Sequence, residues 1–265
     1  MFKSDSLTYA SILSSLTEAA TIPLVVTTSA IALFRRQHLP PPWSPIPADG
    51  PPTPLIIYGA SGAVGTFSIK LARASNIHPI IAIAGSSSAH LLPLLDESKG
   101  DALVDYRIGV EEMKKAVHER LGGLPCHNAF DTISANGTWI PISHMLSPSD
   151  SRTPSYLSVV SGSQKYDDEE IKENVEIVYT FCGPAHTGNY RPGAPKTPAD
   201  REYESDPEWA FVFFKYISRM LADGRLTGHP FEVVDGGLEG VGKGLNMLKE
   251  WKAKGVKYVF RVSNE

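Results

Sequence analysis

Cysteine is scarce in this chain of 265 residues. Only Cys126 and Cys182 are present, far apart and without Cys-x-x-Cys or the cysteine–histidine spacing of zinc ligands. Disulfide scaffolds and structural zinc sites need several cysteines or histidines at short, regular spacings. The sequence therefore predicts neither a disulfide framework nor a metal site, and it is consistent with a reducing compartment.

Positive charge and long apolar runs are also limited. The net charge is -4 and no long basic stretch occurs, so a nucleic-acid partner is not expected. The most apolar stretch, residues 19–34, is shorter than the roughly 20 residues that cross a bilayer, and Asp5 and Glu18 precede it, unlike a signal peptide. We expect a buried helix there, no membrane association and a cytoplasmic location.

Two catalytic signatures are missing as well. Short-chain reductases use a Tyr-x-x-x-Lys pair in which the lysine lowers the tyrosine pKa, and no tyrosine here has lysine four places later. A serine hydrolase would place Gly-x-Ser-x-Gly at a strand-to-helix turn. The closest sequence, GASGA at 59–63, lacks the last glycine. Both classes are therefore disfavoured.

A glycine-rich turn is what the chain does have. Residues 55–58 form a short apolar run, Gly59, Gly62 and Gly65 follow, and a helical pattern covers residues 66–75. Glycines let the backbone turn sharply and approach a diphosphate, while the helix N-terminus offers free N–H groups to the phosphate charge. Ala60 stands where the strict Gly-x-Gly-x-x-Gly pattern has its first glycine. The turn predicts a dinucleotide site; an ordinary glycine turn is the alternative.

The end of the second apolar run indicates which dinucleotide. NAD sites usually place Asp or Glu about 20 residues after the glycines, where it bonds the ribose 2′-hydroxyl. Here the chain reads AGSSS at 84–88, with no carboxylate to repel a 2′-phosphate. Hydroxyl and N–H groups can accept that phosphate, so NADP(H) is favoured. The alternative is a Gly/Ser turn without a role.

Apolar runs and helical patterns alternate from residue 55 to residue 160. We expect strands at 55–58, 79–84, 102–105, 128–133 and 156–160, and helices at 66–75, 89–95, 110–121 and 139–146. Repeated strand–helix units imply a parallel, doubly wound sheet with right-handed crossovers. The predicted fold class is therefore α/β of the Rossmann type.

The regions flanking this alternation are less regular. Residues 39–54 contain eight prolines, which predicts a stiff surface connector. After residue 161 we expect a strand at 176–182, a long loop at 183–207, helices at 208–223 and 242–252, and a closing strand at 257–262. The expected organisation is residues 1–54 as N-terminal helix and connector, and residues 55–265 as the dinucleotide-binding domain with a loop insertion at 183–207.

Several segments, in order along nearly the whole chain, resemble the medium-chain dehydrogenase/reductase superfamily. Within it, the resemblance is to quinone oxidoreductases and fungal trans-acting enoyl reductases of secondary metabolism. The segments are AATIPL at 19–24, TTSA at 27–30, GASGAVG at 59–65, KLA at 70–72, GDA at 100–102, VDYR at 104–107, AFDT at 129–132, GGLEGV at 236–241 and KYVF at 257–260.

The resemblance implies a zinc-free, NADPH-dependent oxidoreductase. Such an enzyme transfers hydride to an activated C=C bond of an enoyl compound or quinone, or to C=O, and takes a small-molecule substrate. Family members carry a GroES-like catalytic domain ahead of the cofactor domain, and this domain is absent here, so we expect a truncated reductase. A homodimer, or a partner enzyme that supplies the missing domain, is expected. The alternative is a non-redox auxiliary or scaffold protein that has lost turnover.

The resemblance also implies roles for individual residues. Thr28 would lie near the nicotinamide as the catalytic hydroxyl, although a helical threonine bonded to its own backbone is an equal alternative. Tyr106 would line the 2′-phosphate, with a surface aromatic as the alternative. The implied cofactor-binding residues are Ser61, Gly62, Ala63, Val64, Gly65, Gly85, Ser86, Ser87, Tyr106, Thr132, Val160 and Ser161.

Two further groups are interpreted as structural. Asp131 ends a predicted strand and is expected to cap a turn rather than act as a base. The histidines His127, His144, His186 and His229 share no spacing, so we expect surface or hydrogen-bonded side chains rather than ligands or general bases.

Overall fold

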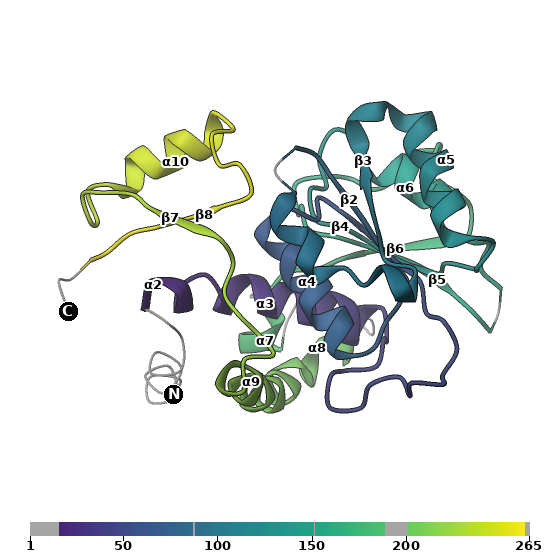
Figure 1. Cartoon of the computed structure of the whole chain (residues 1–265), viewed down its shortest axis with the longest axis horizontal. Coiled ribbons are helices and arrows are strands. Elements are labelled where there is room, and N and C mark those ends of the chain that lie inside the picture. Colours follow the sequence, from purple (N-terminus) through teal and green to yellow (C-terminus); the bar gives the residue numbers. More distant parts are fainter. Residues whose placement is uncertain (1–15, 87, 151, 189–200, 263–265) are drawn as a thin grey trace.

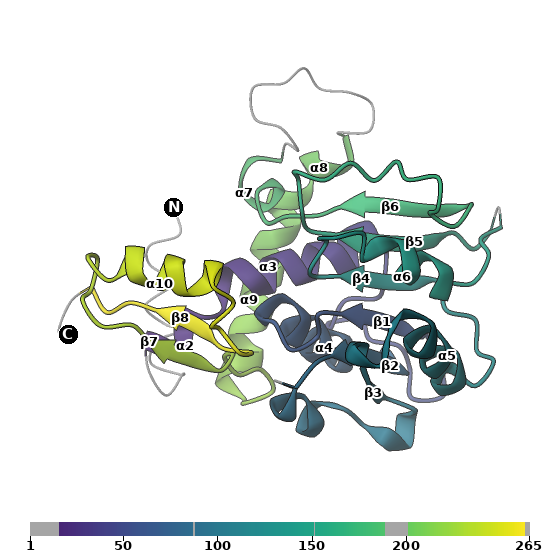
Figure 2. The same ribbon diagram turned by 90° about the horizontal axis from the view of Figure 1, so that it is seen from above.

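Six parallel strands form the central sheet of the computed structural model, which describes residues 16–86, 88–150, 152–188 and 201–262. Figure 2 shows these strands side by side, in the order β3-β2-β1-β4-β5-β6. Their bounds are β1 (Leu55–Tyr58), β2 (Ile80–Ala84), β3 (Ala102–Asp105), β4 (Asn128–Asp131), β5 (Ser155–Val159) and β6 (Val175–Tyr179). Strand order reverses between β1 and β4, as in the predicted Rossmann-type fold, which is thereby confirmed.

The central strands are apolar because helices cover both faces of the sheet. Every residue of β2 is buried, and so are the first three residues of β1. Successive side chains point to opposite faces, so Leu55 and Ile57 enter one core cluster whereas Ile56 enters the other. The apolar runs that predicted these strands therefore reflect burial on both sides.

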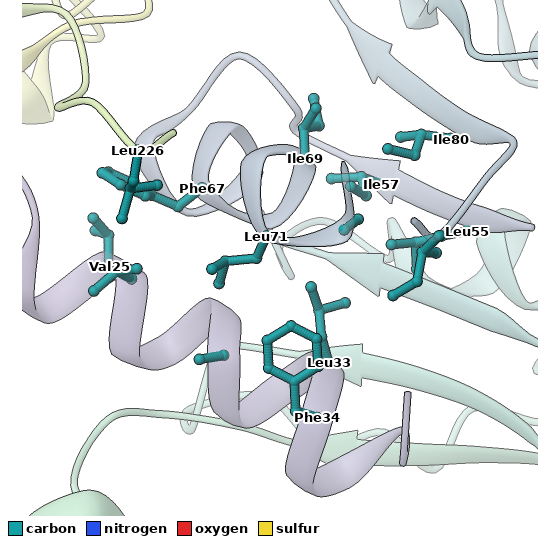
Figure 3. Packing of buried hydrophobic residues seen from close by; sticks show 14 of the residues in the cluster. Val25, Leu33, Phe34, Leu55, Ile57, Phe67, Ile69, Leu71, Ile80 and Leu226 are labelled. Atoms are coloured by element: carbon teal, nitrogen blue, oxygen red, sulfur yellow. The ribbon is translucent and has the colours of Figure 1, made fainter. Parts of the chain in front are cut away.

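One face of the sheet is covered by α3 (Pro23–Ala30), α4 (Ala63–Ala74) and α9 (Asp206–Ala222). Figure 3 shows Val25 and Leu33 facing Phe67 and Leu71 of α4. The other face is covered by α5 (Val110–Leu121) and α6 (Trp139–Met145), whose buried side chains meet the opposite side of β1 and β2. Helices on both faces are the arrangement expected of right-handed βαβ crossovers.

The apolar N-terminal stretch is a buried helix, as predicted, but it is interrupted. It consists of α2 (Leu16–Ala19), α3 and a π-helical turn, η1 (Ile31–Arg36). Leu16–Arg36 is the one segment of the described residues that is long and apolar enough to span a membrane, with a mean hydropathy of 1.5. However, 61% of its apolar window is buried, and Arg36 pairs with the buried Asp206 of α9. Core helices of folded domains meet the same criterion of length and composition.

The proline-rich connector is anchored rather than lying loosely on the surface. Residues 37–54, all of them described, form no helix or strand, as predicted. The Trp43 ring lies 5.8 Å from that of Trp209 and 5.6 Å from that of Tyr216 (centroid to centroid), and the Tyr216 hydroxyl donates to the Pro42 carbonyl at 2.9 Å. The chain here is thus the surface connector that the prolines predict, and its Trp43 side chain fixes it to α9.

The C-terminal segment forms a small unit of its own. β7 (Phe231–Val233), which the sequence pattern did not predict, pairs in parallel with β8 (Lys257–Val259), and α10 (Val241–Lys249) crosses between them. In the described part of the chain this sheet has two strands and is separate from the six-stranded one (Figure 1). We call β7, α10 and β8 the C-terminal unit.

The remaining elements are short. Residues 89–95 were expected to form an α-helix, but Pro93 lies inside this segment and the chain forms a 3₁₀-helix, η2 (Ala89–Leu94). Two more 3₁₀ turns are η3 (Glu97–Lys99) and η4 (Tyr106–Ile108). The predicted loop 183–207 begins and ends in the helical turns α7 (Pro184–Thr187) and α8 (Arg201–Glu204); residues 189–200 lie outside the described residues.

Candidate functional site

The glycine turn connects β1 to α4 at the point where the strand order reverses. Gly59 has a left-handed backbone, with φ +74°, and its carbonyl accepts from the Gly62 N–H at 3.0 Å. A Cβ at Gly65 would lie 2.6 Å from both the Ala60 Cα and the Gly59 oxygen. Glycine at position 65 therefore lets the helix start directly against the turn.

The first turn of α4 offers its N–H groups to a ligand. Gly62 is the N-cap residue, and no side chain among the described residues caps this end. Ser61, Ala63 and Val64 are half-buried, so the turn is accessible to a ligand as well as anchored. Uncapped amides at the positive end of a twelve-residue helix form an anion site, and the switch point of a doubly wound sheet is where diphosphates bind.

The ends of β2 and β3 bring Gly85 and Tyr106 together. A Cβ at Gly85 would lie 2.9 Å from Cε1 of Tyr106, and the Tyr106 ring lies 6.1 Å from that of Tyr58. Tyr106 is 46% exposed, so its side chain is accessible beside Gly85, the residue before Ser86. Ser87, the remaining residue predicted here, lies outside the described residues.

Arg107 is a residue of this region that the sequence reading missed. Its guanidinium pairs with Asp105 at the end of β3, and both side chains are exposed. The hydrogen bonds from the Arg107 side chain and backbone N–H hold the pKa of Asp105 at about 2. The VDYR segment could have indicated this cation, because it places arginine directly after Tyr106.

The predicted groups at the ends of β4 and β5 are engaged within the protein. The Thr132 hydroxyl donates to the Tyr58 carbonyl at 2.8 Å and so joins β4 to β1. The Val160 N–H donates to Ser134 Oγ at 2.9 Å, and the Ser161 carbonyl accepts from the Tyr166 hydroxyl at 2.7 Å. The structure therefore brings these residues to the carboxyl edge, with these particular polar groups already bonded.

Asp131 closes the turn after β4, as predicted. Its buried carboxylate accepts from the N–H groups of Ile133 and Ser134, at 3.0 and 2.9 Å, and from the Thr138 hydroxyl at 2.5 Å. Burial raises the pKa of Asp131, and these three hydrogen bonds oppose the shift. The carboxylate thus serves to fix the turn.

Thr28 lies in α3, which runs beside α4. Its hydroxyl donates to the Leu24 carbonyl at 3.0 Å, the local bond expected of a helical threonine. The next residue, Ser29, reaches across to α4 and donates to the Val64 carbonyl at 2.9 Å. The sequence reading missed Ser29, which is the direct link between α3 and the glycine turn.

The histidines divide into two groups. His127 Nδ1 is hydrogen-bonded to Ser155 Oγ and His144 Nε2 to the Glu170 carbonyl, both at 2.8 Å, as expected of hydrogen-bonded side chains. His229 differs, because it is 2% exposed and its Nδ1 has no hydrogen-bond partner. The His229 side chain is nevertheless hydrogen-bonded to the backbone of Gly255, so the expectation of a hydrogen-bonded side chain holds for it as well. Among the described residues, no group of three or more His, Cys, Asp or Glu side chains could hold a metal ion.

No family model matches the chain. It is 34% identical over 225 residues to trans-enoyl reductase fsr4 of Gibberella fujikuroi, covering 84% of this chain and 59% of that protein. It is 31% identical over 259 residues to trans-enoyl reductase resD of Aspergillus sclerotiorum, covering 94% of this chain and 68% of that protein. The chain thus spans about three fifths to two thirds of the length of these relatives.

Solved structures agree in fold. The CurK enoyl reductase superposes with a TM-score of 0.61 at 17% identity, covering 91% of this chain and 61% of that one. The apo JamJ enoyl reductase gives a TM-score of 0.62 at 14% identity, covering 92% and 63%. The sequence identity to the fungal proteins, together with the glycine turn in a Rossmann-type sheet, shows that the chain belongs to the trans-enoyl reductase family within the medium-chain dehydrogenase/reductase superfamily.

Proposed function

We propose that the chain binds NADPH at the glycine turn and acts as the cofactor-binding part of an enoyl reductase. The observation that carries this proposal is the uncapped N-terminus of α4 at the strand-order switch point, directly after Gly59 and Gly62. When bound, the nicotinamide supplies a hydride to the electron-poor carbon of an activated C=C bond, and a proton completes the reduction at the neighbouring carbon.

The residues present fit a dinucleotide. The amides of Ala63, Val64 and Gly65 point along the axis of α4 toward the place where a diphosphate would sit, and Ser61 lies in the same turn. A Cβ at Gly62 would lie 3.3 Å from the Gly59 oxygen, which is a close contact. Glycine avoids this contact and leaves no side chain over the backbone of the turn. The backbone can therefore approach a phosphate without obstruction.

The preference for NADPH over NADH is supported by the ends of β2 and β3. Gly85 and Ser86 follow β2 where NAD enzymes usually carry a carboxylate. Tyr106 offers a hydroxyl and a ring there, and Arg107, whose guanidinium is bonded to Asp105, would exchange part of that pairing for the phosphate. We place the 2′-phosphate in this region.

Thr28, Thr132, Val160 and Ser161 are proposed for the nicotinamide end. Thr28 would exchange its bond to the Leu24 carbonyl for one to the ring amide or to a substrate oxygen. The residues at the ends of β4 and β5 would bound the ring from the sheet side. Catalysis would rest on positioning and on hydrogen-bond polarisation of the substrate.

A partner domain is proposed to cover the C-terminal unit. Leu238, Leu245, Leu248 and Trp251 are 74%, 59%, 47% and 81% exposed there, an unusual density of large apolar side chains. The proposed partner is a substrate-binding domain that packs on this surface.

Strand β6 lies at one edge of the main sheet, and we propose that it pairs with β6 of a second copy in a homodimer. We also propose a cytoplasmic location for the protein.

Titration with NADPH and NADH, followed by nucleotide fluorescence and melting temperature, tests the cofactor proposal. We expect NADPH-selective binding, and loss of it in Gly62→Asp, whose carboxylate would cap α4 and repel the diphosphate. Gly242→Asp makes the same charge change at an open position of α10 and should bind normally. If the wild-type chain binds neither nucleotide, the proposal is wrong and a non-redox auxiliary role takes its place.

Turnover is tested separately from binding. The chain is mixed with NADPH and panels of enoyl thioesters, quinones and aldehydes, and absorbance at about 340 nm reports oxidation of the nicotinamide. We expect oxidation with enoyl substrates once the partner domain is present. Binding without oxidation in any combination would favour a scaffold function for a retained cofactor site.

A further inference from the structure

Residues 227–229 lead from α9 into the C-terminal unit, and α2 together with the turn between α2 and α3 holds this segment. Glu18 Oε1 accepts from the Gly228 N–H at 2.8 Å, and Thr21 Oγ1 accepts from the His229 N–H at 3.0 Å. A Cβ at Gly228 would lie 2.4 Å from Cγ of Glu18, so the contact leaves no room for a side chain. The path of the chain into the C-terminal unit is therefore fixed by named bonds.

The same segment is bound to the helix of the glycine turn. Lys70 Nζ, one turn of α4 beyond Thr66, donates to the carbonyls of Thr227 and Gly228 at 2.9 and 2.7 Å, and to Thr227 Oγ1 at 3.0 Å. These three acceptors match the three hydrogens of an ammonium group. Residues 227–229 are thus joined to α4 as well as to α2.

His229 places its ring against His90 of η2. The two ring centroids are 5.5 Å apart, with an interplanar angle of 89°. His229 is almost wholly buried, its Nδ1 lacks a partner, and its side chain is hydrogen-bonded to the Gly255 backbone, so packing and one hydrogen bond hold the ring. A shift of residues 227–229 would therefore move the surface against which His90 rests.

His90 connects this contact to the glycine turn. Its Nε2 lies 3.2 Å from Thr66 Oγ1, and the Thr66 hydroxyl donates to the Ala60 carbonyl at 3.2 Å. Since that hydroxyl has one hydrogen and gives it to Ala60, Nε2 of His90 is the donor in the other bond. Ala60 lies between Gly59 and Ser61, within the candidate diphosphate turn.

We propose that His90 is a positioning residue that couples the position of residues 227–229 to the conformation of the glycine turn. Nucleotide affinity then depends on how the C-terminal unit packs against the rest of the protein. The proposal deepens the cofactor site and, for its binding readout, rests on the proposed function. A domain that packs on the C-terminal unit would influence the cofactor site through a path of contacts. The path, or relay, consists of His229, His90, Thr66 and Ala60.

A double-mutant cycle on NADPH affinity tests the relay. His229→Leu removes the ring at similar bulk, and His90→Gln removes the ring that it contacts. Each single variant loses one link of the path, a ring contact in His229→Leu and the hydrogen bond to Thr66 in His90→Gln, and we expect roughly three- to tenfold weaker binding for each. The double variant should bind no more weakly than His90→Gln alone, because the two changes break one path. Purely additive losses would show independent structural effects and overturn the relay.

A second readout needs no nucleotide. Amide hydrogen exchange over residues 59–66 should be faster in His90→Gln and in His229→Leu than in wild type, with no further increase in the double variant. His144→Gln, which changes an exposed histidine bonded to the Glu170 carbonyl, should leave exchange there unchanged. Unchanged exchange in folded His90→Gln overturns the proposal, even if His229→Leu fails to fold.

The two readouts separate this inference from the cofactor proposal. If wild type binds neither nucleotide while the exchange cycle behaves as expected, the relay exists and the proposed function is wrong. If NADPH binds tightly but both cycles are additive, the cofactor site is real and His90 is not its positioning residue.

Discussion

Ser29 Oγ donates to the Val64 carbonyl at 2.9 Å, and this bond joins α3 to the second residue of α4. Ser29 is completely buried, so the bond lies in the core between the two helices rather than at the surface. The Val64 carbonyl also accepts from Ser68 Oγ at 2.9 Å, and it therefore keeps one partner if Ser29 is changed.

Ser29→Ala should lower the free energy of unfolding by about 0.5–1.5 kcal/mol, because one buried hydrogen bond is lost while the Val64 carbonyl keeps another hydrogen-bond donor. It should also weaken NADPH binding slightly, because α4 loses its direct link to α3. Urea denaturation and nucleotide titration measure the two effects. Ser163→Ala, at an exposed position of the loop after β5, should change stability by less than about 0.5 kcal/mol.

Gly65→Ala should be strongly destabilising, by on the order of 2–4 kcal/mol, since the new methyl group would meet backbone atoms that cannot rotate away. The matched change Gly242→Ala adds the same methyl group where no atom lies within 4 Å, inside helix α10. It should be neutral or stabilising. Thermal unfolding of the two variants side by side would contradict this packing argument if their melting temperatures fell equally.

Asp206→Asn should cost about 3–5 kcal/mol, because it leaves the buried Arg36 guanidinium without its counter-charge. The pair joins η1 to the start of α9, and Arg35 Nε also donates to Asp206 at 2.8 Å. As a control, Asp223→Asn breaks an exposed pair with Arg225 and should cost at most about 1 kcal/mol. Chemical denaturation distinguishes the buried pair from the exposed one.

Stability should fall as the pH drops from about 6.5 toward 4, in part through His229. Burial lowers the pKa of His229 to about 4, with His90, Lys70 and Lys257 as lesser causes, whereas an unfolded histidine titrates near 6.5. Between these values the unfolded chain binds a proton that the native protein does not, so acid favours unfolding.

The size of this effect is on the order of 1–2 kcal/mol between pH 6.5 and pH 5. Denaturation of wild type and of His229→Leu at both pH values isolates it from other titrating groups. Glu18 on α2 also faces residues 227–229 and is unchanged in both proteins. Equal pH slopes in the two proteins would rule out His229 as the group responsible.

The sequence alone predicted those strands and helices whose hydrophobic pattern is visible within a short window of residues. Strands 55–58 and 102–105 and helix 110–121 have the predicted bounds, since burial on both faces and helical periodicity are visible in short windows. The glycine turn was recognisable for the same reason: Gly59, Gly62 and Gly65 are close in sequence.

What the sequence could not show depends on contacts between distant residues. Trp43 gave no local sign that it would pack on Trp209, and β7 is three residues long with a parallel partner 26 positions later. His229 looked like any other histidine, because burial against His90 is set by the tertiary fold. The bond that occupies the Val160 N–H likewise became visible only with the turn after β4 in place, whereas the backbone bond of Thr28 was one of two alternatives that the sequence offered.

The hydrogen bonds that join α2 and the turn after it to residues 228, 229 and 257 have a consequence for the order of folding. Glu18 meets Gly228 across 210 positions, Thr21 meets His229 across 208, and Lys257 donates to the Thr21 carbonyl across 236. During translation α2 leaves the ribosome before the six strands of the main sheet, whereas its partners at 228, 229 and 257 leave after all six. The six-stranded sheet can therefore form before the contacts of α2 with residues 228, 229 and 257 exist, and these contacts of high sequence separation are expected to form late in folding.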